Sequence, residues 1–175
     1  MPETISNVCR QPASHNGRDG LQIMPKFETF RRVKHAAGDM FDLVADVEKY
    51  PGFVPLCSKL SVKSHRTLES GRQVLVADMT VSYKVIQETF ATKVTLDRAR
   101  GEILVEYLDG PFRHLENKWS FKEIEPSVCD VGFYISYEFK SRMLAGVAGA
   151  VFDKAFRKFS SAFEARADEV YGAAV

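Results

Sequence analysis

Long apolar runs are missing from this sequence. A membrane-spanning helix needs about 20 consecutive apolar residues, whereas the longest uncharged apolar stretch near the C-terminus covers only residues 143–152. The N-terminus also lacks the apolar segment of a secretory signal. We therefore expect a protein of the cytoplasm without a transmembrane helix.

The sequence has few cysteines and almost no net charge. The three cysteines, Cys9, Cys57 and Cys129, are odd in number and do not have the spacing of a zinc site. We interpret them as reduced thiols that pack like small apolar side chains. The 24 basic and 23 acidic residues leave a net charge of +1. Nucleic-acid-binding proteins usually carry a clear basic excess, so this balance argues against DNA as a partner.

Catalytic motifs are missing as well. The sequence has four histidines, but no HExxH zinc motif, no nucleophile elbow, no glycine-rich phosphate loop and no CxxC pair. His114 could form an acid–base pair with Asp109 or Glu116, but Asp109 lies in a turn sequence and Glu116 is expected to point outward. We therefore predict a protein that is not an enzyme, has no catalytic or metal-binding residues and requires no cofactor.

Phenylalanine, in contrast, is abundant. The chain has 13 Phe, and hydrophobic residues make up 45% of its 175 positions, which is enough for one domain with a large apolar interior. Residues 1–23 are polar and aperiodic, which predicts a disordered leader, and Met24 is a candidate for the natural start. The domain is expected to span residues 24–172.

The middle of the chain has the pattern of an antiparallel meander, because turn residues separate short apolar runs. We predict strands near residues 26–35, 58–67, 73–83, 85–96, 102–108, 115–125 and 128–140. In the last of these, apolar residues at odd positions from Val131 to Phe139 alternate with more polar ones. Such alternation is typical of a sheet with one buried face.

A short helix and a proline-rich loop separate the first two predicted strands. Asp39 is predicted to cap this helix, in which Phe41 belongs to the apolar face. The segment YPGFVPLC, residues 50–57, has two prolines and is predicted to form a tight turn.

From about residue 142 to residue 171 the apolar period changes to 3.6 residues, which predicts one long amphipathic helix. Its apolar face has a small or aliphatic row and an aromatic row, which are Leu144, Ala148, Val151, Ala155 and Ala162, and Phe152, Phe156, Phe159 and Phe163. The fold class predicted is α+β, with a curved antiparallel sheet around this helix and an apolar cavity between them. The small row would leave the space for that cavity.

Three residues of this helix do not fit a simple amphipathic pattern. Gly146 and Gly149 should each cost about 1 kcal/mol relative to Ala, which suggests either a mobile first turn or close packing against a neighbouring backbone. Arg166 falls within the apolar arc, so the helix either leaves the sheet there or the side chain extends to the surface.

Four segments resemble those of a known family: MPKFETFRRVKH at 24–35, DLVADVEKYPGFVPLC at 42–57, DGPFRHLENKWSF at 109–121 and SRMLAGVAGAVFDKAF at 141–156. The chain resembles the START-like, polyketide-cyclase-type superfamily with the helix-grip fold. Within it, the chain is similar to the coenzyme Q-binding family, which also contains the bacterial ribosome-association toxin. The resemblance implies a pocket for ubiquinone or a related isoprenoid lipid, in support of respiratory electron transport. As a separate expectation, the protein would make peripheral contact with the inner membrane.

Thirteen residues are predicted to contact this ligand. Phe41, Tyr50, Phe53 and Leu56 would frame the entrance. The walls would come from Met79, Trp119, Phe133 and Tyr137 on the sheet and from Leu144, Val147, Val151 and Phe152 on the helix, with Asn117 offering a hydrogen bond to a quinone carbonyl. Lipid pockets combine apolar walls with a few polar groups of this kind. Ordinary core packing is the competing interpretation of most of these residues.

Several alternatives remain open from the sequence. The basic residues of strands 26–35 and 58–67 would either protect sheet edges or attract anionic lipid headgroups. A ribosome-associated regulator of translation is the second functional hypothesis. A polyketide cyclase or aromatase is the third, although it would need polar residues inside the pocket.

Overall fold

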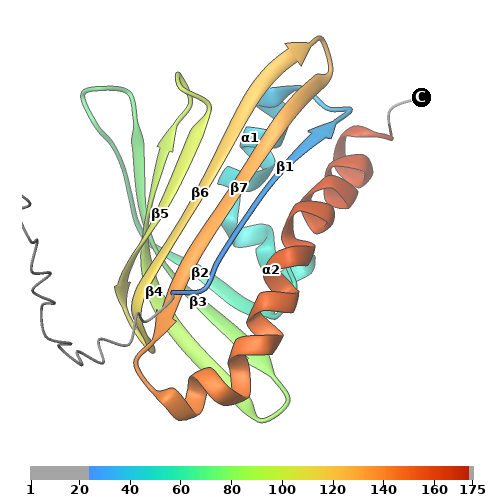
Figure 1. Ribbon diagram of the computed structural model, residues 1–175. Coiled ribbons are helices and arrows are strands. Elements are labelled where there is room, and N and C mark those ends of the chain that lie inside the picture. The colour runs from blue at the N-terminus through green and yellow to red at the C-terminus, as the bar shows by residue number, and fades with distance from the viewer. Residues whose placement is uncertain (1–23, 174–175) are drawn as a thin grey trace, which may run out of the picture.

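The computed structural model describes residues 24–173, so the predicted leader lies outside the described residues. Seven strands and two α-helices follow one another along the chain, with one 3₁₀ helix after the first α-helix (Figure 1). They are β1 (Lys26–Val33), α1 (Ala37–Ala45), η1 (Val47–Gly52), β2 (Cys57–Thr67), β3 (Gln73–Tyr83), β4 (Ile86–Asp97), β5 (Glu102–Asp109), β6 (Phe112–Glu125), β7 (Val128–Phe139) and α2 (Arg142–Tyr171).

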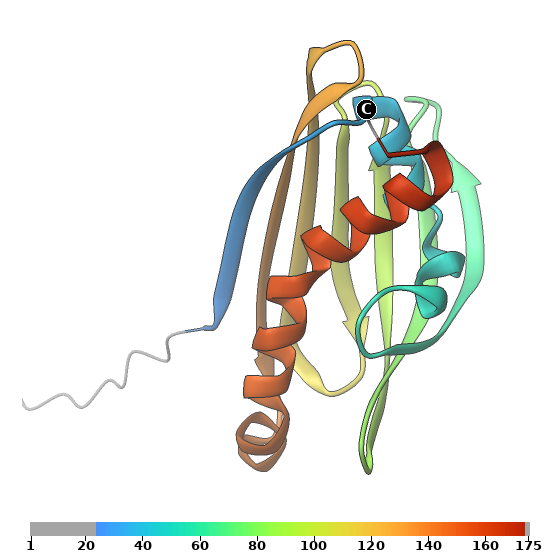
Figure 2. The same cartoon turned by 90° about the vertical axis from the view of Figure 1, so that its right-hand side faces the viewer.

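The seven strands form one antiparallel sheet in the order β1-β7-β6-β5-β4-β3-β2. The meander from β2 to β7 is built from hairpins, and β1 adds to its far edge by pairing with β7. The sheet curves around α2, which crosses its concave face diagonally (Figure 2). The α+β helix-grip prediction is therefore confirmed, and the two basic strands are the sheet edges as expected.

Element boundaries differ from the predictions at three places. β1 ends at Val33 rather than at residue 35. β6 begins at Phe112 rather than near residue 115, because a bulge lets Phe112 pair with Phe139 before the regular register resumes at His114. α1 begins at Ala37, and the predicted Asp39 cap is wrong. Ala36 is the N-cap and makes no side-chain cap bond. Instead, Glu123 of β6 accepts a hydrogen bond from the Ala37 N–H at 2.6 Å and satisfies the helix terminus.

The aromatic row of α2 attaches the helix to the sheet. Phe152, Phe156 and Phe163 are buried, whereas Phe159 is half-buried. Phe152 meets the fully buried Phe112 at 6.2 Å between ring centroids. Edge-to-face aromatic contacts of this kind add to the free energy gained by burial.

The small row of α2 is less uniform than predicted. Ala148 and Ala155 are buried, but Leu144, Val151 and Ala162 are only half-buried. An added Cβ at Gly146 or Gly149 would meet no atom within 4 Å, so the close-packing explanation for these glycines is wrong. Ser141 caps the helix by accepting a hydrogen bond from the Leu144 N–H at 3.3 Å.

No described helix has the length and apolar character needed to cross a membrane.

Candidate functional site

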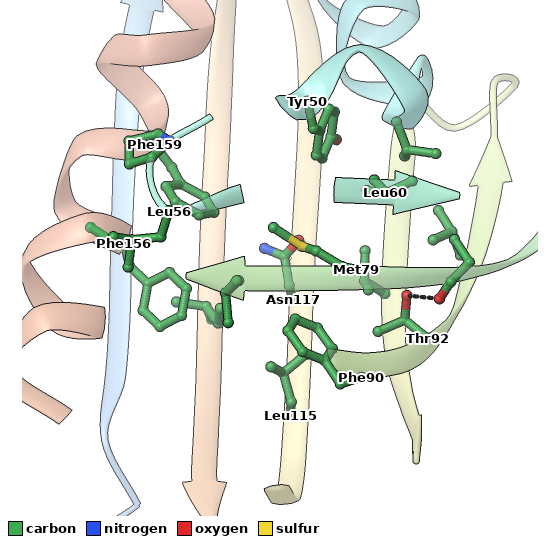
Figure 3. A pocket seen from close by; sticks show the side chains of 18 of the residues that line it. Tyr50, Leu56, Leu60, Met79, Phe90, Thr92, Leu115, Asn117, Phe156 and Phe159 are labelled. Atoms are coloured by element: carbon green, nitrogen blue, oxygen red, sulfur yellow. Dashed lines mark hydrogen bonds between the residues drawn. The ribbon is translucent and has the colours of Figure 1, made fainter. Parts of the chain in front are cut away.

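A cavity lies between the concave face of the sheet and the middle of α2 (Figure 3). Its volume is about 90 Å³, measured as the space open to the centre of a water-sized sphere. Most of its lining is aliphatic or aromatic, and it comprises Val47, Tyr50, Pro55, Leu56, Leu60, Ala77, Met79, Val81, Phe90, Thr92, Val94, Ile103, Val105, Leu115, Asn117, Trp119, Ile135, Phe152, Ala155, Phe156, Phe159 and Phe163.

The space exists because small side chains stand where large ones would fill it. Ala77 of β3 and Ala155 of α2 are both buried and both line the cavity. One water needs roughly 10–15 Å³ on the same measure, so the cavity is larger than a packing defect. It has room for a ring-sized group but not for a long isoprenoid chain.

Asn117 and Trp119 provide the main polar feature of the lining. The Trp119 indole N–H donates to Asn117 Oδ1 at 3.0 Å, and Asn117 Nδ2 donates to the Tyr134 carbonyl at 2.8 Å. An indole can only donate, so this bond fixes the orientation of the amide. The second Nδ2 hydrogen has no partner among the described residues and is available to an acceptor.

Two hydroxyl groups, those of Tyr50 and Thr92, are the other polar side-chain groups of the lining. Tyr50 donates its hydroxyl to the Val44 carbonyl at 2.6 Å, and burial raises the pKa of this phenol. Thr92 donates to the Ala77 carbonyl at 3.4 Å. Both oxygens keep acceptor capacity. None of the described side chains that line the cavity carries a charge at neutral pH, so the site has no group to neutralise a carboxylate or phosphate.

The structure brings six of the thirteen predicted contact residues to this cavity. They are Tyr50, Leu56, Met79, Asn117, Trp119 and Phe152. Tyr50 is held firmly, because its ring packs edge-on against Phe163 at 5.2 Å while its hydroxyl is hydrogen-bonded. It therefore belongs to the wall rather than to a flexible entrance.

Three predicted residues lie one layer behind the lining. Phe133 packs against Trp119 at 4.7 Å, and Tyr137 packs against Phe156 at 5.1 Å. Phe53 packs against Phe163 at 5.0 Å, and the Arg166 guanidinium lies over it at 5.7 Å. The extension of Arg166 across an apolar surface matches one of the two expectations for that residue.

The remaining four lie elsewhere. Phe41 is buried between α1 and β6, where it packs against Phe121 at 5.8 Å, so its predicted place at the entrance is wrong. Val147 is 59% exposed, and its predicted place on the cavity wall is also wrong. Leu144 is half-buried outside the lining, and Val151 faces grooves outside the cavity.

Sequence reasoning missed most of the wall. The inward residues of β4 and β5, such as Phe90, Thr92, Val94, Ile103 and Val105, form a large part of it. Their alternation is visible in the sequence. However, alternation identifies only the buried face, and it does not show which part of that face lies opposite the small residues of α2.

Leu56 stands at the mouth of the cavity. It also lines two outer grooves, one bounded by the β3–β4 hairpin and α2, the other containing Lys154 and Lys158. Its φ of 65° is left-handed, a conformation that costs a leucine roughly 1–2 kcal/mol. A hydrogen bond of 2.9 Å from the Ser82 N–H to the Leu56 carbonyl holds it there. Residues held in such conformations cluster at ligand clamps and switch regions.

The described residues that line the cavity include no histidine, cysteine or carboxylate. His114 bonds through Nε2 to Ser136 Oγ at 2.8 Å, and both residues, like Glu116, alternate with the inward-facing residues of their strands and so lie on the outer face of the sheet. Burial raises the thiol pKa of Cys57 and of Cys129 to about 11, so neither is a thiolate at neutral pH. Within residues 24–173, no group of three or more His, Cys, Asp or Glu could hold a metal ion.

A curved seven-stranded sheet that encloses a terminal helix, with an apolar cavity between them, defines a protein of the helix-grip class. Residues 33–164 match the family described as polyketide cyclase / dehydrase and lipid transport, and the chain belongs to that family.

Its relatives include proteins with two different names. The ribosome association toxin RatA of Escherichia coli K12 is 33% identical over 151 residues, which are 86% of this chain and 92% of the toxin. The mitochondrial coenzyme Q-binding protein COQ10 homolog B of Xenopus laevis is 28% identical over 173 residues, covering 92% of this chain and 68% of that protein. Among solved structures, an 18 kDa protein of Caulobacter crescentus is 33% identical with a TM-score of 0.69, covering 86% of this chain and 100% of that one.

Proposed function

We propose that this protein binds ubiquinone or a related isoprenoid lipid and delivers it in support of respiratory electron transport, without catalysing a reaction. The observation that carries the proposal is the cavity with an apolar lining and one oriented amide donor at Asn117. A quinone ring has two carbonyl acceptors and no charge, and it matches this lining. The coenzyme Q-binding relatives support the same ligand class.

The size of the cavity limits how the ligand would lie. A space of about 90 Å³ admits the ring, so the isoprenoid tail would leave past Leu56 into the outer grooves. Burying apolar surface at roughly 25 cal/mol per Å² would provide most of the affinity. The hydrogen bond from Asn117 would orient the ring rather than add much affinity.

Trp119 supplies a direct test, because it is the single tryptophan and lines the cavity. Titration with a short-chain ubiquinone should quench its fluorescence. Ala155→Leu fills the cavity and should weaken binding about tenfold or more, because the added carbons occupy the space that the quinone ring would need. Ala165→Leu is the matched control, because Ala165 is exposed on the same helix.

Organic extraction of the protein from a quinone-producing host should also release ubiquinone, detected by mass spectrometry. A protein that carries no lipid and shows no quenching would contradict the proposal. If Ala155→Leu and Ala165→Leu bound the quinone with equal affinity, the quinone would have to bind outside this cavity.

A ribosome-associated regulator is the second candidate. It is supported by the RatA relatives, of which this chain covers 92%, against 68% for the Xenopus coenzyme Q-binding protein. Co-sedimentation with ribosomal subunits in sucrose gradients at moderate salt tests it. Binding that survives Ala155→Leu would show that ribosome association does not need the cavity, and absence of co-sedimentation would remove this candidate.

A further inference from the structure

The two most exposed large apolar side chains of the described residues lie at the same end of the molecule. Val85, at the tip of the β3–β4 hairpin, is 99% exposed, and Met143, in the first turn of α2, is 79% exposed. Both the hairpin tip and the start of α2 project at the bottom of Figures 1 and 2. Tyr83, 36% exposed, and Val147, 59% exposed, belong to the same two elements, so four large apolar side chains gather at this end. Exposed apolar groups that gather in one region mark an interaction surface.

Helical spacing extends this apolar end towards the cavity. At 100° per residue, Met143, Val147, Val151, Lys154 and Lys158 fall on one stripe of α2. The lower part of the stripe is apolar, and its upper part lines the outer groove beside Leu56. The stripe therefore joins the exposed end of the helix to the mouth of the cavity.

The charged side chains around this mouth are mostly basic. Lys84 lies beside Val85, and Lys154 and Lys158 line the groove. None of these three lysines takes part in an ion pair between described residues. On the basic edge strand β1, in contrast, Arg31 pairs with Glu164 at 2.6 Å and Arg32 with Asp130 at 2.8 Å.

Two acidic side chains lie on the same elements as these three lysines. Glu88 is half-buried on β4, and Asp153 on α2 pairs with Arg157 at 2.9 Å. Apolar side chains flanked by unpaired lysines suit a bilayer whose headgroups are anionic, since lysines near such a surface attract it and apolar groups enter the interface.

We propose that this end, formed by Tyr83, Lys84, Val85, Met143, Val147, Lys154 and Lys158, docks on an anionic phospholipid bilayer and places the cavity mouth against the lipid. We call these residues the docking end. The proposal goes beyond the proposed function, because it does not require that the cavity ligand be a quinone. It also differs from attraction through the edge strands β1 and β2, where several basic groups are already paired.

Vesicle flotation with the full chain tests the proposal. Vesicles of phosphatidylcholine and phosphatidylglycerol should carry the protein up the gradient, and phosphatidylcholine alone should carry much less. Val85→Asp with Met143→Asp should reduce flotation about tenfold or more. Replacing Lys84, Lys154 and Lys158 by Ser should cause a similar loss and remove most of the salt dependence.

Matched controls lie on the other surfaces. Phe30→Asp alters a side chain that is 70% exposed on the outer face of the sheet, and Lys26→Ser with Lys59→Ser removes charges from both edge strands. These variants should float like the unmodified protein. Loss of flotation in the edge variant, normal flotation of the Val85/Met143 variant, or no flotation with anionic vesicles would each overturn the proposal.

A second measurement locates the contact directly. Val85→Trp should show a blue shift of emission with anionic vesicles and quenching by brominated lipid, whereas Phe30→Trp should show neither. The buried Trp119 gives the same background in both variants. A shift at position 30 but not at position 85 would place the membrane contact elsewhere.

Discussion

Trp119 donates its indole N–H to Asn117 Oδ1 at 3.0 Å, two residues along the same strand. Both side chains face the cavity because residues i and i+2 share one face of a strand. Asn117 Nδ2 is tied in turn to the Tyr134 carbonyl of β7. The amide is therefore held in one orientation before any ligand arrives, which lowers the entropic cost of using it for recognition.

This relationship predicts non-additive effects in a mutant cycle. Asn117→Leu leaves the buried indole N–H without an acceptor and should lower the free energy of unfolding by about 1–3 kcal/mol. In Asn117→Leu with Trp119→Phe the orphaned donor is gone, so the double variant should lose less stability than the sum of the single variants. Urea unfolding followed by circular dichroism measures all four proteins. Strict additivity would mean that the hydrogen bond does not couple the two residues.

Replacing the two glycines near the start of α2 by alanine is expected to stabilise the protein. Added methyl groups at Gly146 and Gly149 meet no atom within 4 Å, so Gly146→Ala and Gly149→Ala should each raise the free energy of unfolding by about 1 kcal/mol. Stopped-flow quenching of Trp119 by a short-chain quinone should become slower if the first turns of α2 move during uptake.

Gly132 is the contrasting control for these two variants. A Cβ there would collide with Ser120 Oγ and approach the Phe30 ring to 3.0 Å, so Gly132→Ala should destabilise. Destabilisation by Gly146→Ala would show that this helical turn needs the backbone freedom of glycine in the folded state.

Two substitutions of Leu56 can distinguish the effect of its backbone strain on stability from the effect of its side chain on quinone uptake. Leu56→Gly and Leu56→Ala both remove the side chain at the mouth, and both should speed quinone uptake. Only glycine relieves the left-handed backbone at φ 65°, so Leu56→Gly should be more stable than Leu56→Ala by about 1 kcal/mol. Thermal unfolding and stopped-flow quenching measure the two effects. Unchanged uptake in both variants would show that Leu56 does not control the mouth.

The buried thiols predict a loss of stability at high pH. Burial raises the pKa of Cys57 and of Cys129 from 9.0 to about 11. The unfolded chain therefore releases these protons first, and the free energy of unfolding should fall as the pH rises from 9.0 to about 11. Urea unfolding across this range should show a smaller fall in a variant with Cys57→Val and Cys129→Val.

Thiol labelling checks the same burial independently. In a Cys9→Ser background, iodoacetamide should react slowly with the folded chain at neutral pH and rapidly after denaturant is added. Fast labelling of the folded chain would contradict the protection of Cys57 and Cys129.

The sequence by itself determined the antiparallel meander and the long terminal helix, because these depend on patterns that a chain carries locally. Alternation from Val131 to Phe139 identified the buried face of β7, and the change to a 3.6-residue period identified α2. The turn residues divided the meander into hairpins, and each hairpin pairs neighbouring strands. The strand boundaries were off by three residues at most, at the start of β6, where Phe112 pairs with Phe139 across a bulge.

Only the tertiary structure decided which apolar residues surround empty space. Val147 and Val151 are four residues apart on one stripe of α2, yet Val147 is exposed, whereas Val151 is half-buried and lines the outer grooves together with Leu56. Phe41 and Trp119 are both buried aromatics, but only Trp119 lies opposite the small residues that leave the cavity open. Periodicity states which face of an element is buried, whereas a cavity depends on how side-chain volumes from several elements add up at one place, and that sum is set by their packing in three dimensions.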